Sequence, residues 1–97
     1  MNKDLLSDFF AGTFHQDMEF DAEDWRALVG LYGGRTTIEK SRRVADEIEV
    51  GLIGSGMDDH DLREYIQDEL GSHYDCTIEW KTTRDWLGAI VDALRSS

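Results

Sequence analysis

The chain has 97 residues, of which 21 are acidic and 10 are basic, so its formal net charge is −11 at pH 7. A chain of this length supports one domain with one modest hydrophobic core. The negative charge argues against nucleic acid or an anionic membrane as a direct partner, because phosphate groups would be repelled, and it favours a basic protein partner.

Apolar side chains recur with helical spacing in five segments, and the gaps between these segments are rich in Gly, Asp, Ser and Thr. The first segment ends near Gly12, and its apolar face comprises Leu5, Leu6, Phe9 and Phe10. The second segment stops at Gly33 and Gly34, and its apolar face comprises Trp25, Leu28, Val29 and Tyr32. The i, i+3, i+4, i+7 pattern of the second segment is that of one face of a helix.

The third and longest segment begins at TTIE, where Thr36 and Glu39 have the spacing of a capping box, and it runs to GSG at 54–56. Its apolar face comprises Ile38, Ala45, Ile48 and Leu52. The fourth segment begins in MDDHD, ends at Gly71, and has an apolar face of Leu62, Tyr65, Ile66 and Leu70. The fifth begins at TTRD, where Thr82 or Thr83 can cap the helix, and it buries Trp86, Leu87, Ile90, Val91 and Leu94.

Residues 72–81, SHYDCTIEWK, separate the last two segments. Apolar and polar residues alternate here, but one strand without a partner does not make a sheet, so we expect an ordered loop. Trp80 in this loop can be either a core anchor or an exposed contact for a partner. The whole pattern predicts an all-α fold, a bundle of about five helices that forms a single small domain over residues 1–97.

Cys76 is the single cysteine, so no intramolecular disulfide can form, which suits a reducing cytosol. Asp4, Ser7 and Asp8 interrupt the apolar residues near the N-terminus, unlike the unbroken core of a signal peptide. No stretch approaches the roughly 18 to 20 apolar residues of a membrane span. We therefore expect a cytoplasmic protein with no membrane partner.

Residues 14–25, FHQDMEFDAEDW, contain five carboxylates and no lysine or arginine. A calcium loop that starts at Asp17 would place Ala22 where a glycine must turn and Leu28 where a bidentate carboxylate is required. A zinc site needs three or four converging ligands, and only His73 and Cys76 are close in sequence. No phosphate-binding or catalytic motif is present. We therefore predict no metal, no cofactor and no catalytic residues.

The charge is distributed unevenly. Residues 58–69 contain six acids and one base, whereas residues 35–43, RTTIEKSRR, contain four bases and one acid. The apolar face of the fourth segment turns Asp61, Glu64 and Asp68 outward together. Most charge runs are solvated helix faces, but two acidic regions in one small protein favour a cationic partner. The candidate binding residues are Glu19, Asp21, Asp24, Asp58, Asp61, Glu64, Asp68, Tyr74 and Trp80.

Several sequence motifs occur together in this chain. They are the FF…FHQD segment that closes the first helix, the L/V..EI..GL pattern of the third, the L...I.DELG pattern of the fourth and the terminal WLGAIVDAL. With them the chain resembles the contact-dependent growth inhibition immunity proteins of the CdiI type. The resemblance runs from Leu5 to Leu94, and its most specific part is the stretch 14–17, supported by Trp86 and Leu87.

The resemblance implies an all-helical cytoplasmic protein that binds and neutralises the C-terminal toxin domain of a secreted protein, commonly a nuclease. A nuclease needs a basic face to hold phosphate, and an acidic protein complements that face. In this family the FHQD motif implies a structural role, with Phe14 buried and His15, Gln16 and Asp17 holding the first connection. Two other functions remain open: an acidic adaptor for another basic protein, and an orphan enzyme that uses Cys76 with a histidine.

Overall fold

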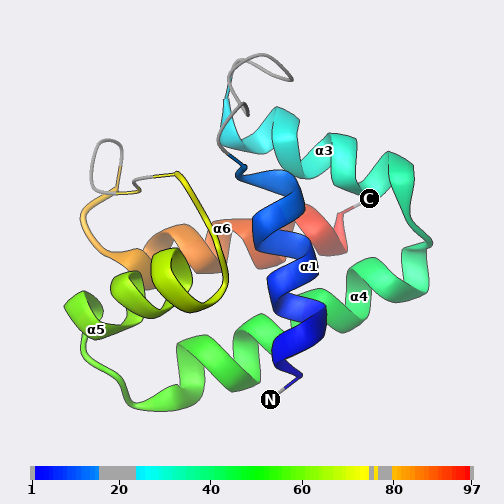
Figure 1. Cartoon of the computed structure of the whole chain (residues 1–97). Coiled ribbons are helices and arrows are strands. Elements are labelled where there is room, and N and C mark those ends of the chain that lie inside the picture. Colours follow the sequence, from blue (N-terminus) through cyan, green and yellow to red (C-terminus); the bar gives the residue numbers. More distant parts are fainter. Residues whose placement is uncertain (1, 16–23, 75, 77–79, 97) are drawn as a thin grey trace.

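The computed structural model describes residues 2–15, 24–74, 76 and 80–96. Within these ranges the chain forms helices and no strand (Figure 1). The helices are α1 (Lys3–Thr13), α3 (Trp25–Arg35), α4 (Ile38–Glu47), α5 (Asp59–Glu64) and α6 (Thr83–Arg95). Helix α4 continues through Ile48–Leu52 and Ile53–Ser55, and α5 continues through Tyr65–Glu69. The predicted all-α fold of about five helices is confirmed.

A polar side chain starts each helix by accepting a hydrogen bond from a backbone N–H three residues later. The N-caps of α1, α3, α4, α5 and α6 are, in order, Asn2, Asp24, Thr37, Asp58 and Thr82. Of the two threonines that could start the last helix, Thr82 is therefore the cap. Thr83 follows it with its side chain buried.

The predicted start of α4 is wrong by one residue. Thr36 follows α3 as its C-cap, and the Thr37 hydroxyl accepts from the Lys40 N–H at 3.1 Å. Glu39 therefore lies one position too early to complete a capping box. Ile38, which we expected in the core, is 49% exposed, because the first turn of α4 lies at the edge of the bundle where the chain arrives from α3 (Figure 1).

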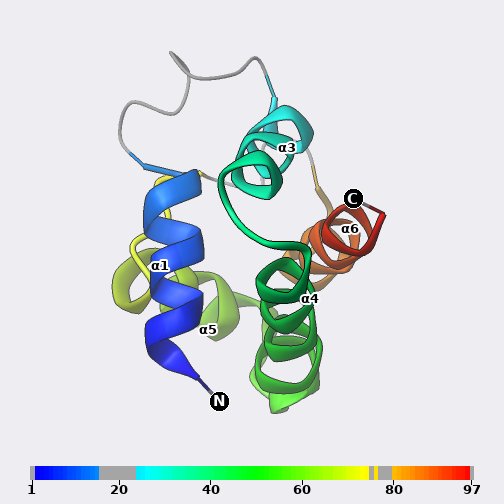
Figure 2. The same ribbon diagram turned by 90° about the vertical axis from the view of Figure 1, so that its right-hand side faces the viewer.

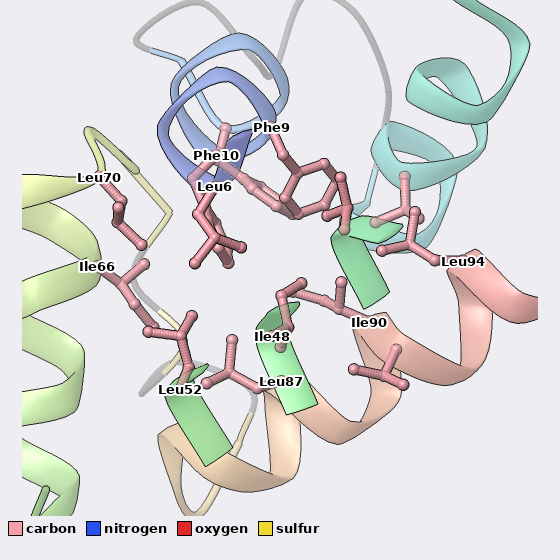
Figure 3. Close-up of a cluster of buried hydrophobic side chains, with 14 of the residues drawn as sticks. Leu6, Phe9, Phe10, Ile48, Leu52, Ile66, Leu70, Leu87, Ile90 and Leu94 are labelled. Atoms are coloured by element: carbon pink, nitrogen blue, oxygen red, sulfur yellow. The ribbon is translucent and has the colours of Figure 1, made fainter. Parts of the chain in front are cut away.

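Helix α6 packs against α3, α4 and α5. Figure 2 shows α1 on the opposite side of the bundle from α6, with α3 across one end. Side chains from α1, from the end of α4 and from α6 point toward one another in Figure 3, where the labelled residues include Leu6, Phe10, Ile48, Leu52, Leu87 and Ile90. All six are fully buried. The assignment of Trp25, Tyr32, Trp86 and Leu87 to the core is also confirmed.

Helix α5 ends in a widened turn that meets α1. The Leu70 N–H donates to the Tyr65 carbonyl at 3.2 Å, a spacing of five residues instead of four. Gly71 then reverses the chain with φ of 79°, and the Ser72 N–H donates back to the Ile66 carbonyl at 3.1 Å. A Cβ at Gly71 would lie 3.1 Å from Cβ of Ala11, so the turn sits directly on α1.

Asp59 joins the start of α5 to the start of α6. Its Oδ1 accepts from the Thr83 N–H at 2.8 Å and from the Arg84 N–H at 3.3 Å. The Arg84 guanidinium in turn donates to the carbonyls of Ile53 and Met57. A carboxylate next to the first N–H groups of a helix also interacts favourably with the helix dipole. These bonds fix the connection between α4 and α5 against α6.

We expect Asp59→Ala to lower the free energy of unfolding by about 1 to 3 kcal/mol, because the N–H of Thr83, a residue that is only 1% exposed, loses its acceptor. Asp61→Ala is the matched control, since Asp61 is exposed on the same helix. Urea unfolding followed by circular dichroism measures both. Equal midpoints for the two variants would show that the bonds from Asp59 do not stabilise the fold.

Candidate functional site

The predicted acidic side chains of the fourth helix lie on one exposed side of it. Leu62 and Ile66 face the core at 0% and 1% exposure. The opposite side carries the exposed carboxylates of Asp61, Glu64 and Asp68, and the exposed N-cap Asp58 precedes them. We call these four residues the α5 acidic face. The predicted outward direction of Asp61, Glu64 and Asp68 therefore agrees with the structure, although the helix widens between Glu64 and Asp68.

Several acidic residues outside the α5 acidic face form ion pairs with basic residues of the same chain. The pairs are Lys3–Glu69 at 2.8 Å, Lys40–Asp8 at 3.4 Å, Arg95–Asp46 at 2.9 Å and Arg95–Glu49 at 3.1 Å. The hydrogen bond from Lys3 lowers the pKa of Glu69, and the hydrogen bonds to Glu49 and then Asp46 raise the pKa of Arg95. These groups are exposed, so each pair adds little stability. The pairs leave these acids less available to a partner.

Fewer of the carboxylates on the α5 acidic face are engaged in ion pairs within the described ranges. Within the described ranges, the carboxylates of Asp61 and Asp68 have no ion-pair partner, and Glu64 lies 3.1 Å from His60, four residues earlier. Asp58 has a second role, because its carboxylate caps α5 through the Asp61 N–H at 2.8 Å. A basic partner could therefore contact Asp61 and Asp68 without breaking an existing ion pair.

The acidic stretch 14–25 is described only at its ends. Phe14 is fully buried as expected, and its carbonyl accepts from the His73 N–H at 2.6 Å. Asp24 is exposed and caps α3 through the Ala27 N–H at 2.8 Å. The expected roles of Gln16 and Asp17, and the candidate contacts Glu19 and Asp21, lie outside the described residues.

Tyr74 and Trp80 are half-buried and pack on aromatic rings of the core. The Tyr74 ring lies 5.1 Å from the Trp86 ring and 5.7 Å from the Phe14 ring, measured between centroids. The Trp80 ring meets the Trp25 ring edge-on at 5.6 Å. Trp80 therefore packs against the core with one part of its ring and exposes the other part to solvent. Both side chains are held by packing while part of each remains accessible.

Cys76 is 1% exposed, and its sulfur lies 3.5 Å from the Thr83 hydroxyl. His60 and His73 are at the surface. In the part of the chain that the structure describes, no three His, Cys, Asp or Glu side chains are grouped so that they could hold a metal ion. None of the described helices has both the length and the apolar character needed to cross a membrane.

Two features of the structure are not predicted by local sequence patterns. Asp59 is one acid among several in MDDHD, and nothing in its spacing distinguishes a carboxylate that binds a distant helix from one that faces water. The second feature is a groove between α1 and α3. Its polar side chains come from three helices that only the tertiary fold brings together.

The fold and surface define a small all-helical protein with a strongly acidic face on one helix. A family model described as CdiI immunity protein matches residues 2–94, and the chain belongs to this family. The match covers every motif on which the resemblance rested. Comparisons with curated proteins and with solved structures gave no match.

Proposed function

We propose that this protein acts in the cytoplasm, where it binds and neutralises the C-terminal toxin domain of a contact-dependent growth inhibition system. The membership of residues 2–94 in the immunity protein family carries this proposal. Its test is direct: the domain encoded at the end of the large open reading frame immediately upstream should bind this protein, and co-expression should protect cells from that domain. A domain that binds but still kills would contradict neutralisation.

The proposed toxin domain is a basic nuclease. A nuclease must present positive charge to the phosphates of its substrate, and a chain with a net charge of −11 complements such a surface. The proposed complex contains protein alone, without a cofactor, metal ion, nucleic acid or membrane bound by this chain. Cys76 has a packing role in this proposal, since a thiol that is 1% exposed is poorly placed to attack a substrate.

The α5 acidic face is the proposed main contact, and among the described residues its Asp61 and Asp68 make no ion pair. Tyr74 and Trp80 are proposed as neighbouring aromatic contacts, because rings already fixed by packing lose little conformational entropy on binding. Asp24, Glu19 and Asp21 form a second proposed acidic group. Because Asp24 and Asp58 also cap helices, their charge is best removed by replacement with asparagine, which caps equally well.

The triple variant Asp61→Asn, Glu64→Gln, Asp68→Asn should slow association with the toxin domain. Long-range attraction should bring the parent to about 10⁸ M⁻¹s⁻¹ at low salt, and removing three charges from the steering face should cost about tenfold. The difference should shrink as salt screens the charges. Stopped-flow binding across a salt series measures this, with dissociation expected to change less.

A matched control removes the same net charge from other places. Asp4, Glu39 and Asp85 are exposed residues in the first turns of α1, α4 and α6. The triple variant Asp4→Asn, Glu39→Gln, Asp85→Asn should keep most of the association rate. If both triple variants slow association equally, the net charge alone steers the toxin, and the α5 acidic face is not a specific contact. A pull-down that recovers another basic protein but not the toxin domain would favour the adaptor function.

A further inference from the structure

Two adjoining hollows lie where α1 and α3 meet the start of α4. The first has a volume of about 200 Å³ and is lined by Asp8, Gly12, Tyr32, Arg35, Thr36 and Lys40. The second has a volume of about 150 Å³ and is lined by Gly12, Thr13, Leu28, Leu31 and Arg35. The two hollows share Gly12 and Arg35 in their linings, and we call them together the α1–α3 groove.

Two residues that line the groove, Thr13 and Tyr32, have buried hydroxyl groups. Thr13 is 2% exposed and Tyr32 is 6% exposed, and neither hydroxyl has a partner among the described residues. Burial raises the pKa of Tyr32, and the nearby Thr36 hydroxyl opposes this shift without reaching normal hydrogen-bond geometry. An unpaired buried hydroxyl is costly, so such groups are usually satisfied by a water or a ligand.

The charge in the groove has the opposite sign to that of the protein as a whole. Arg35 has no ion pair within the described ranges, and Lys40 makes only a 3.4 Å contact with Asp8, in which both side chains are exposed. An exposed pair of this length is weak and easily exchanged. Beside these cations, Leu31 is 45% exposed although it is a large apolar residue. The groove thus combines the positive charge of Arg35 and Lys40 with the apolar surface of Leu28 and Leu31.

We propose that the α1–α3 groove binds a segment of the toxin domain in which a carboxylate side chain adjoins an apolar one. The carboxylate accepts hydrogen bonds from Arg35 and from Lys40, which exchanges Asp8 for the new anion. The side chains of Tyr32 and Thr13 lie beneath the bound segment as part of the groove lining. The apolar neighbour covers Leu28 and Leu31. This inference rests on the proposed toxin binding and adds a second contact, opposite in sign to the α5 acidic face.

A side chain at Gly12 can fill the groove without disturbing the fold. A Cβ at Gly12 would meet nothing within 4 Å, and Gly12 lies inside α1, where other residues form helix more readily than glycine. Gly12→Leu should therefore fold normally and weaken binding of the upstream-encoded toxin domain by about tenfold or more. Gly30→Leu is the matched control, because Gly30 lies within α3, has the same open space and is outside the groove. Arg35→Gln should also weaken binding.

A second experiment tests the groove without the toxin domain. The peptide N-acetyl-Leu-Asp-amide is titrated into the parent protein and the Gly12→Leu variant while amide NMR shifts are recorded. Saturable shifts at Gly12, Thr13 and Arg35 in the parent, absent in the variant, would support the groove, whereas equal shifts from inorganic phosphate would overturn its preference for a carboxylate beside an apolar group. A toxin domain that binds the parent and Gly12→Leu equally would overturn the inference and leave the proposed function intact. If the toxin domain does not bind at all, the proposed function fails and the peptide titration decides whether the groove binds this ligand class.

Discussion

Trp86→Ala is expected to leave the protein unfolded or only marginally folded. Trp86 is 1% exposed, and its ring lies within 5.1 to 6.1 Å of the rings of Tyr74, Phe14 and Phe10, measured between centroids. Truncation of a buried tryptophan costs about 3 to 5 kcal/mol, against a total stability of roughly 5 to 15 kcal/mol for a small domain. Through these contacts the Trp86 ring joins α6 to α1 and to the loop before α6, so its loss affects three parts of the fold at once.

Urea unfolding followed by circular dichroism and by tryptophan fluorescence measures this effect. Trp86→Phe is the informative comparison, because it keeps an aromatic ring in the cluster and removes an indole N–H that has no hydrogen-bond partner among the described residues. We expect Trp86→Phe to cost far less than Trp86→Ala. Val50→Ala, at a residue that is 75% exposed, should change little. A Trp86→Ala protein with a midpoint close to that of the parent would disprove the anchoring role.

Gly71→Ala is expected to lower the free energy of unfolding by about 1 to 5 kcal/mol. The backbone at Gly71 has φ of 79°, which costs a residue with a Cβ about 1 to 2 kcal/mol. The new Cβ would also lie 3.1 Å from Cβ of Ala11, and crowding of this kind costs about 1 to 3 kcal/mol. The smaller entropy of the unfolded alanine chain returns about 0.4 to 1 kcal/mol.

Two other glycines and one alanine separate these contributions. Gly56 has φ of 80° with nothing near its Cβ position, so Gly56→Ala isolates the backbone cost of about 1 to 2 kcal/mol, reduced by the same entropy term of about 0.4 to 1 kcal/mol. Gly88 lies within α6 with open space around it, and Gly88→Ala should be neutral or stabilising. Ala11→Gly should recover part of the loss in Gly71→Ala. If Gly71→Ala and Gly56→Ala prove equally destabilising, the contact with α1 contributes nothing.

The position of the α5 acidic face depends on the two ends of its helix. At the start, Asp59 bonds to the backbone of α6, and at the end, the turn at Gly71 rests on Ala11 of α1. Loss of either attachment leaves the carboxylates of the α5 acidic face in place but free to change direction. We therefore expect Gly71→Ala to weaken toxin binding by displacing the α5 acidic face. Because the charges remain, the association rate should still fall steeply with added salt.

The helices themselves follow from the sequence. The apolar spacing placed Trp25, Tyr32, Trp86 and Leu87 in the core. The threonines before the third and fifth apolar stripes located those two helix starts to within a residue. Local patterns predict these features well, because helix periodicity and capping depend on residues at most a few positions apart. The family resemblance is also a property of the sequence, and the match over residues 2–94 confirms it.

The contacts between helices were decided by the tertiary structure. Ile38 has the spacing of a core residue but lies exposed, because burial depends on whether another helix covers that turn. Asp59 cannot be distinguished from its acidic neighbours until α6 is placed beside it, since Asp59 and Thr83 are 24 residues apart. The α1–α3 groove exists because residues from three helices meet around Gly12 and Arg35. In each case the deciding interaction joins side chains or backbone groups that are distant in sequence, and no local periodicity records which distant groups will meet.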